Sequence, residues 1–145
     1  MAYYVTTMLI RRSADDTFAF ISDLRNAPKW DPQTVEASML SQGPIAAGAQ
    51  FLLVGNLLGC KLKLPYEIRL YDPPRELVIA GQTAVLRYND RITLAPHGPE
   101  THLTYEARLE VKGFLRLANP LLPLVFRRIG DAATRHMPEA VERLA

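Results

Sequence analysis

Hydrophobic and polar residues alternate through most of the chain, and this pattern predicts a largely β domain. Residues 3–11 alternate and are rich in β-branched and aromatic side chains, which is typical of a strand. Further alternating runs follow between residues 33 and 111, separated by turn-forming stretches such as Gly43-Pro44 and Asp72-Pro73-Pro74. The sequence therefore predicts about six more strands in an antiparallel meander, with one buried face and one face in water.

The alternation also assigns side chains to the buried face. In the first strand the expected inner residues are Tyr4, Thr6, Met8 and Ile10. In the later runs they are Val35, Ala37 and Met39; Leu62, Leu64, Tyr66, Ile68 and Leu70; Leu86, Tyr88, Asp90, Ile92 and Leu94; and Leu103, Tyr105, Ala107, Leu109 and Val111. Three tyrosines and one carboxylate thus fall on a face that is otherwise apolar.

A short helix is predicted directly after the first strand. Ser13 is a suitable N-cap, and acidic residues follow it where the helix dipole favours them. Phe18, Ile21 and Leu24 form its expected buried stripe. Residues 26–32 contain two prolines, which predict a stiff loop that carries Trp30. Trp30 either plugs the mouth of a cavity or packs the helical region onto the sheet.

The end of the chain changes to a helical period. Apolar residues recur at intervals of three and four from residue 122 onward, which predicts one long amphipathic helix beginning near Pro120 or Pro123. Arg128 and Asp131 fall on its polar side. Pro138 lies inside the helix and predicts a kink or a break. This helix is the only predicted element large enough to cover the apolar face of the sheet, and the space between them would suit a small apolar ligand.

Composition narrows the functional classes. The 145 residues fit a single domain spanning residues 1–145, and 17 basic against 15 acidic residues give a net charge of +2, too small to indicate nucleic-acid binding. A single cysteine, Cys60, excludes an internal disulfide and a cysteine-based zinc site and favours a reducing cytoplasm. The apolar stretch 114–126 is interrupted by polar residues and prolines, so no transmembrane segment is expected, and the N-terminus does not resemble a signal peptide.

No catalytic or metal-binding motif is evident. His97, His102 and His136 are far apart in the sequence, which favours three unrelated histidines over a metal site. Phosphate-binding loops and nucleophile elbows are absent from the sequence, and no cofactor is expected. The sequence motifs therefore assign no catalytic residue.

Asp90 is the most informative polar residue. An ionised carboxylate on an apolar face is costly unless it is paired. One interpretation is that a β-bulge reverses the parity of the strand, or that Asp90 lies at the solvent-exposed rim of the sheet. The other is that Asp90 is a polar anchor inside a cavity. His136 either bonds to backbone or water at the rim, or turns inward to meet Asp90 or a tyrosine. The three inner tyrosines either pack in the core or orient a ligand with their hydroxyls. The expected ligand-binding residues are Trp30, Tyr66, Tyr88, Asp90, Tyr105, Phe126, Ile129, Ala133 and His136.

The chain resembles a known superfamily. The resemblance rests on the order of elements, Phe18-x-x-Ile21-x-Asp23 with Pro28-x-Trp30-x-Pro32, the hairpin Gly98-Pro-Glu-Thr-His-Leu-Thr-Tyr105, and the closing amphipathic helix. It is similar to the START-like helix-grip (SRPBCC) superfamily, and most similar to its polyketide cyclase/dehydrase group. That resemblance implies an α+β fold in which a seven-stranded antiparallel sheet grips a long C-terminal helix around a hydrophobic cavity, with two short helices after strand 1. The chain is much shorter than lipid-transfer START domains, which argues against binding of bulky two-tailed lipids.

Three functions follow as hypotheses. The first is a non-catalytic binder of a small hydrophobic or aromatic molecule. The second is a polyketide aromatase/cyclase or dehydratase, for which Asp90, His136 and the inner tyrosines are the only candidate acids and bases. The third is a protein-interaction module in which the outer charges of the sheet and the Leu57–Leu58 loop meet another protein. Leu57, Leu58 and the stretch 115–125 are candidate exposed apolar patches. The same patches could mediate a homodimer.

Overall fold

Seven strands form one antiparallel sheet in the spatial order β1-β7-β6-β5-β4-β3-β2. The computed structural model describes residues 2–57, 59–112 and 122–143, without the side chains of residues 57, 122–126, 129 and 134. The strands are β1 (Ala2–Ile10), β2 (Thr34–Met39), β3 (Gln50–Leu57), β4 (Cys60–Asp72), β5 (Glu76–Gln82), β6 (Leu86–His97) and β7 (Glu100–Val111). The helices are α1 (Ala14–Ser22), α2 (Ala27–Trp30) and α3 (Leu122–Glu142). The predicted α+β meander is confirmed.

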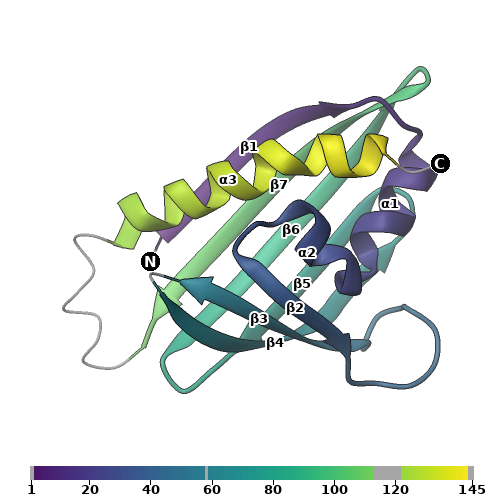
Figure 1. Cartoon of the computed structure of the whole chain (residues 1–145). Coiled ribbons are helices and arrows are strands. Elements are labelled where there is room, and N and C mark those ends of the chain that lie inside the picture. Colours follow the sequence, from purple (N-terminus) through teal and green to yellow (C-terminus); the bar gives the residue numbers. More distant parts are fainter. Residues whose placement is uncertain (1, 58, 113–121, 144–145) are drawn as a thin grey trace.

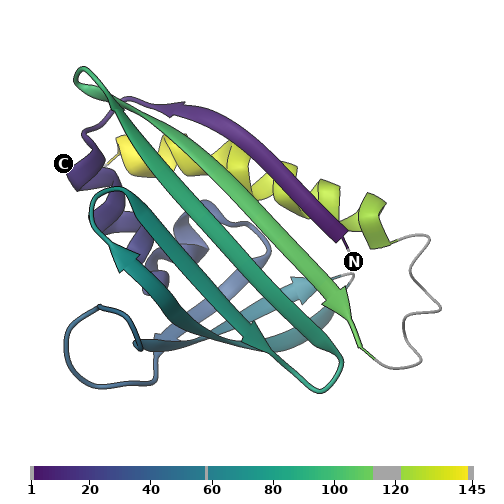
Figure 2. The same ribbon diagram turned by 180° about the vertical axis from the view of Figure 1, so that it is seen from behind.

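All three helices lie on one side of the sheet. Figure 1 shows α3 running along the concave face beside β1 and β7, with α1 and α2 at one end of the same face. Seen from behind in Figure 2, the opposite face of the sheet carries no helix among the described residues. α3 contacts β1, β7 and α2. This is the expected helix-grip arrangement.

The buried stripe of α3 follows its sequence pattern. Ala133, Met137 and Val141 are buried, whereas Arg128 and Asp131 are exposed as predicted. Ile129 is also predicted to be buried, but its side chain lies outside the described part of the structure. The helix continues through Pro138 to Glu142, so the alternative of a break is wrong. Met137 and Val141 are fully buried on either side of the proline, and this packing holds the last turn despite the lost hydrogen bond.

The segment between β1 and β2 is more helical than its prolines suggest. The Ser13 hydroxyl accepts a hydrogen bond from the backbone N–H of Asp16 at 3.1 Å, which confirms the predicted cap. The predicted stiff loop around Trp30 is wrong, because a 3₁₀ turn at Leu24–Asn26 leads directly into α2. Pro28 lies in the first turn of α2, where a missing N–H costs no hydrogen bond.

Two register shifts move side chains that the alternation assigns to the inner face. Between Thr34 and Glu36 the pairing of β2 with β3 shifts, so Val35 is exposed and Thr34 is buried. Between Ile68 and Leu70 the pairing of β4 with β5 shifts. Leu70 is therefore exposed, and the ring of Tyr71 instead meets Phe18 at a centroid distance of 5.3 Å.

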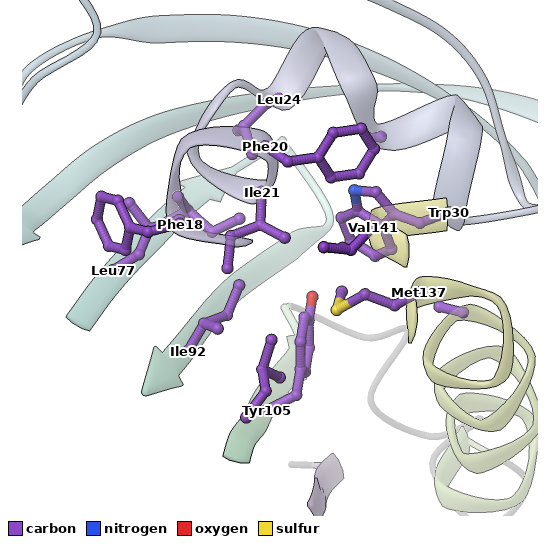
Figure 3. Close-up of a cluster of buried hydrophobic side chains, with 14 of the residues drawn as sticks. Phe18, Phe20, Ile21, Leu24, Trp30, Leu77, Ile92, Tyr105, Met137 and Val141 are labelled. Carbon is purple, nitrogen blue, oxygen red and sulfur yellow. The ribbon is translucent and has the colours of Figure 1, made fainter. Parts of the chain in front are cut away.

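The core fills the space between the helices and the sheet. Figure 3 shows Phe18 and Ile21 from α1 above Leu77 and Ile92 of the sheet, with Met137 of α3 beside them. Closer to the N-terminal end of α3, a Cβ atom on Gly130 would lie 2.8 Å from the ring of Tyr4. Only glycine allows this close approach of α3 to β1, which draws the helix to one edge of the sheet.

Candidate ligand cavity

A cavity of about 170 Å³ lies between the sheet, the residues around α2, and α3. Residues from all seven strands and from α3 contribute to its mostly apolar wall. Six of the nine predicted ligand-binding residues lie in the wall: Trp30, Tyr66, Tyr88, Asp90, Tyr105 and Ala133. The side chains of Phe126 and Ile129 are outside the described part. A separate depression of about 380 Å³ lies among arginine and glutamate side chains on the outer face of β6 and β7.

Asp90 points into the cavity. β6 pairs with both neighbours without a register shift, so its alternation is preserved and the alternative of a bulge is wrong. The carboxyl is buried, and Oδ2 accepts a hydrogen bond from the hydroxyl of Tyr105 at 2.6 Å. Burial raises the pKa of Asp90 to about 7; the Tyr105 hydrogen bond opposes the rise and the nearby Asp31 adds to it.

The inner tyrosines form an aromatic wall around this carboxyl. The rings of Tyr66 and Tyr88 lie 4.7 Å apart, and the hydroxyl of Tyr88 donates to the carbonyl of Pro65 at 2.5 Å. Tyr105 meets Trp30 edge to face at 6.3 Å. Burial raises the pKa of Tyr66 and of Tyr105 well above the ordinary value, so both hydroxyls stay protonated and can donate hydrogen bonds.

Asp31 is a second carboxyl in the cavity wall that the sequence analysis did not single out. Its Oδ1 accepts from the backbone N–H of Gln33 at 3.0 Å, and its Oδ2 accepts from the hydroxyl of Thr34 at 2.8 Å. Burial raises its pKa, while these hydrogen bonds and His136 oppose the rise. The only sequence signal for Asp31 is an acidic residue that follows Trp30 and lies between two prolines. An aspartate at such a position commonly forms hydrogen bonds with the turn that follows it, so this signal does not by itself indicate a ligand site.

The histidines lie outside the cavity wall, and His136 takes the first of its two predicted positions. His136 is exposed, its Nδ1 lies 2.7 Å from the carbonyl oxygen of Ala132, and it is not part of the cavity wall. The alternative in which His136 bonds to the backbone at the rim is therefore confirmed, and the alternative in which it turns inward to Asp90 or a tyrosine is wrong. His97 and His102 are brought together by the β6–β7 hairpin, with ring centroids 4.7 Å apart and ring planes tilted by 40°. Within the described ranges, no three His, Cys, Asp or Glu residues gather as a metal site.

Replacing Tyr105 with phenylalanine tests the electrostatics of the carboxyl. The Tyr105 hydroxyl stabilises the charged form of Asp90, so Tyr105→Phe should raise the pKa of Asp90 further above about 7. Carbon-13 NMR titration of the aspartate carboxyls would measure the change. Tyr66→Phe is the matched control, because its hydroxyl makes no hydrogen bond to Asp90. A titration midpoint that stays unchanged in Tyr105→Phe would contradict the assignment.

Comparison with protein families and solved structures adds an independent finding. The family model described as polyketide cyclase / dehydrase and lipid transport matches residues 1–142. No curated protein sequence matches the chain. Among the described residues, none of the helices is long and apolar enough to cross a membrane.

Three solved structures illustrate the shared fold. A START superfamily protein from Mycobacterium smegmatis is 18% identical, with a TM-score of 0.76, and covers 98% of this chain and 95% of its own. TTHA0849 from Thermus thermophilus is 14% identical, with a TM-score of 0.80 and 96% of each chain covered. The Zhui aromatase/cyclase from Streptomyces sp. R1128 is 15% identical, with a TM-score of 0.82, and 97% and 93% of the two chains are covered. At these identities the likeness shows the fold alone.

Proposed function

Because the chain belongs to the polyketide cyclase/dehydrase and lipid transport family, we propose that it binds a small hydrophobic or aromatic molecule in the cavity between the sheet and α3. The observation that carries this proposal is the cavity itself, whose wall is mostly apolar and holds a few convergent polar groups. Such a combination is typical of small-molecule sites, in which apolar walls provide affinity and the polar groups fix orientation.

The size of the cavity limits the ligand. An engineered protein cavity of about 150 Å³ is large enough to take up benzene. The present cavity, at about 170 Å³, therefore suits a molecule built on a single aromatic ring or a comparably short aliphatic chain. Trp30 and the inner tyrosines supply flat apolar surfaces, which favour an aromatic ring over a flexible chain.

The expected result is thermal stabilisation of the protein by toluene, indole and similar single-ring compounds. A ligand that binds only the folded state at about 100 times its Kd should stabilise the fold by about 2.7 kcal/mol. Differential scanning fluorimetry across a panel of single-ring, two-ring and long-chain compounds would measure the shift in Tm. The single-ring compounds should give the largest shifts.

A pair of alanine variants provides the control. Ala133 is buried in the cavity wall, so Ala133→Leu should fill the cavity and abolish the shift in Tm. Ala19 is exposed on α1, and Ala19→Leu should leave the shift unchanged. The proposal fails if no compound stabilises the wild-type protein, or if Ala133→Leu responds as strongly as the wild type.

A second candidate function, a polyketide aromatase/cyclase or dehydratase, is favoured by one observation. A buried carboxyl with a pKa of about 7 can both accept and donate a proton near neutral pH, as general acid–base catalysis requires. Asp90 would then remove a proton next to a carbonyl group, and the hydroxyl of Tyr105 would help to orient the chain. Cyclisation of a short poly-β-keto thioester mimic by the wild-type protein, followed by product analysis, would separate this candidate from simple binding.

A further inference from the structure

The cavity wall holds two carboxyls that no lysine or arginine of the described residues balances from inside the cavity. The two carboxyls are Asp31 and Asp90. His136, which lies outside the wall, opposes the rise that burial causes in the pKa of Asp31, but no cation of the described part has this effect on Asp90. The one cationic residue in the described wall is Arg108, but it is exposed and its guanidinium lies 5.3 Å from the ring centre of Tyr3 on the outer face of the sheet. No described lysine or arginine side chain therefore neutralises the two carboxyls from within the cavity.

Asp90 has bonding capacity left for a ligand. Its Oδ2 receives the Tyr105 hydroxyl, whereas Oδ1 receives no hydrogen bond from the described residues. A carboxylate can accept about four hydrogen bonds, so Asp90 can accept further donors from inside the cavity. The oxygens of Asp31, in contrast, are each occupied by the turn that follows it.

The aromatic side chains complete the environment. Trp30, Tyr66, Tyr88 and Tyr105 lie in the same wall as Asp90. Aromatic faces attract organic cations, and the attraction grows when water is excluded. A buried carboxylate surrounded by aromatic rings is therefore suited to an ammonium group. The same surroundings disfavour a carboxylate ligand, because its charge would be repelled by both aspartates.

We propose that the cavity selects small aromatic molecules that carry a protonated amine, with the ammonium group paired to Asp90 and the ring held by the surrounding aromatic side chains. This inference rests on the proposed function, because it names the class of ligand for the same cavity. The pairing would offset the cost of keeping Asp90 ionised in an apolar site, and binding should therefore favour its charged form.

A matched series of single-ring compounds tests the selectivity. The series consists of 2-phenylethylamine, 2-phenylethanol and 3-phenylpropionate, with toluene as the uncharged reference. Near pH 8, isothermal titration calorimetry with the wild-type protein should show that the amine binds at least about tenfold more tightly than the alcohol, as expected for a charge-assisted hydrogen bond. The carboxylate should bind more weakly than the alcohol.

Two variants attribute the selectivity to the cavity carboxyl. Asp90→Asn keeps the size of the side chain but removes the charge, so the preference for the amine over the alcohol should fall to about threefold or less. Glu106→Gln removes a carboxyl from the adjacent strand at a position outside the cavity wall, and it should keep the wild-type preference. Circular dichroism would confirm that both variants are folded.

The outcomes separate the two proposals. If toluene or the alcohol binds but the amine binds no more tightly than the alcohol, the inference is overturned and the proposed function stands. A preference for the carboxylate, or an amine preference that survives in Asp90→Asn, also overturns the inference alone. If none of the four compounds binds, both the inference and the proposed function fail.

Discussion

Gly81→Ala should destabilise the protein by about 3 kcal/mol, the upper range for overpacking a well-filled site. A Cβ atom on Gly81 would lie 1.9 Å from the carbonyl oxygen of Pro65 and 2.7 Å from the ring of Tyr88. The carbonyl belongs to the backbone of β4 and cannot turn away, and the Tyr88 hydroxyl donates to that same oxygen. The substitution must therefore separate β4 from β5 or expel the Tyr88 ring.

Gly55→Ala is the matched control for this prediction. The corresponding Cβ atom would make only ordinary contacts, at 3.7 Å, with the backbone of Gln33 and the side chain of Leu64. Both glycines are in strands, so the gain in strand propensity from alanine is shared. Urea denaturation should show a large loss of stability for Gly81→Ala and little change for Gly55→Ala. Equal effects of the two substitutions would contradict the close packing around Tyr88.

The second large effect is the pH dependence of stability that arises from Asp90. Its pKa rises from 3.8 in the unfolded chain to about 7 in the fold, mainly through burial. Between these values the folded state binds more protons than the unfolded state, so this group's contribution to stability is complete below about pH 4 and is lost as the pH rises through about 7. The loss should be about 4 kcal/mol in total.

Asp90→Asn removes the titration and keeps an oxygen that can accept the Tyr105 hydrogen bond. The free energy of unfolding of wild type minus variant should therefore fall by about 4 kcal/mol between pH 4 and pH 8, so that the variant is favoured at alkaline pH. Urea denaturation of both proteins across this range would give the difference, in which the other carboxyls cancel. Asp90→Leu should show the same trend. Parallel stability curves for wild type and variants would contradict a buried carboxyl.

Strict alternation made much of the site predictable from the sequence. β6 and β7 pair without a register shift, so the inward positions of Tyr88, Asp90 and Tyr105 follow from parity alone. The same reasoning fails at Val35 and Leu70, because the strand pairing shifts register beside each of them and strict alternation is lost there. Nothing in the local composition marks either shift, since both positions carry ordinary strand residues.

The meeting of side chains from distant elements could not be predicted. His136 directly precedes Met137 in α3. Successive residues of an α-helix are rotated by about 100° about its axis, so His136 is exposed although Met137 is buried. Asp31 reaches the cavity only because α2 is placed under α3, which depends on tertiary contacts and not on local pattern. The local pattern predicts a loop in place of α2, although Pro28 in the first turn is compatible with a helix. The second short helix is implied only by the family resemblance, and it is confirmed.

The pairing of β1 has a consequence for how the chain folds during synthesis. β1 lies at the edge of the sheet and its only strand partner is β7, with Ala2 opposite Leu109 and Ile10 opposite Thr101. Its inner side is covered by α3, where Tyr4 donates a hydrogen bond to Asp131. β1 is therefore synthesised before both β7 and α3, and it pairs with them only after a chain segment of about 90 residues has been made. Closure of the β1–β7 pair should therefore be a late step of folding, and until then the apolar side chains of β1 are exposed to aggregation.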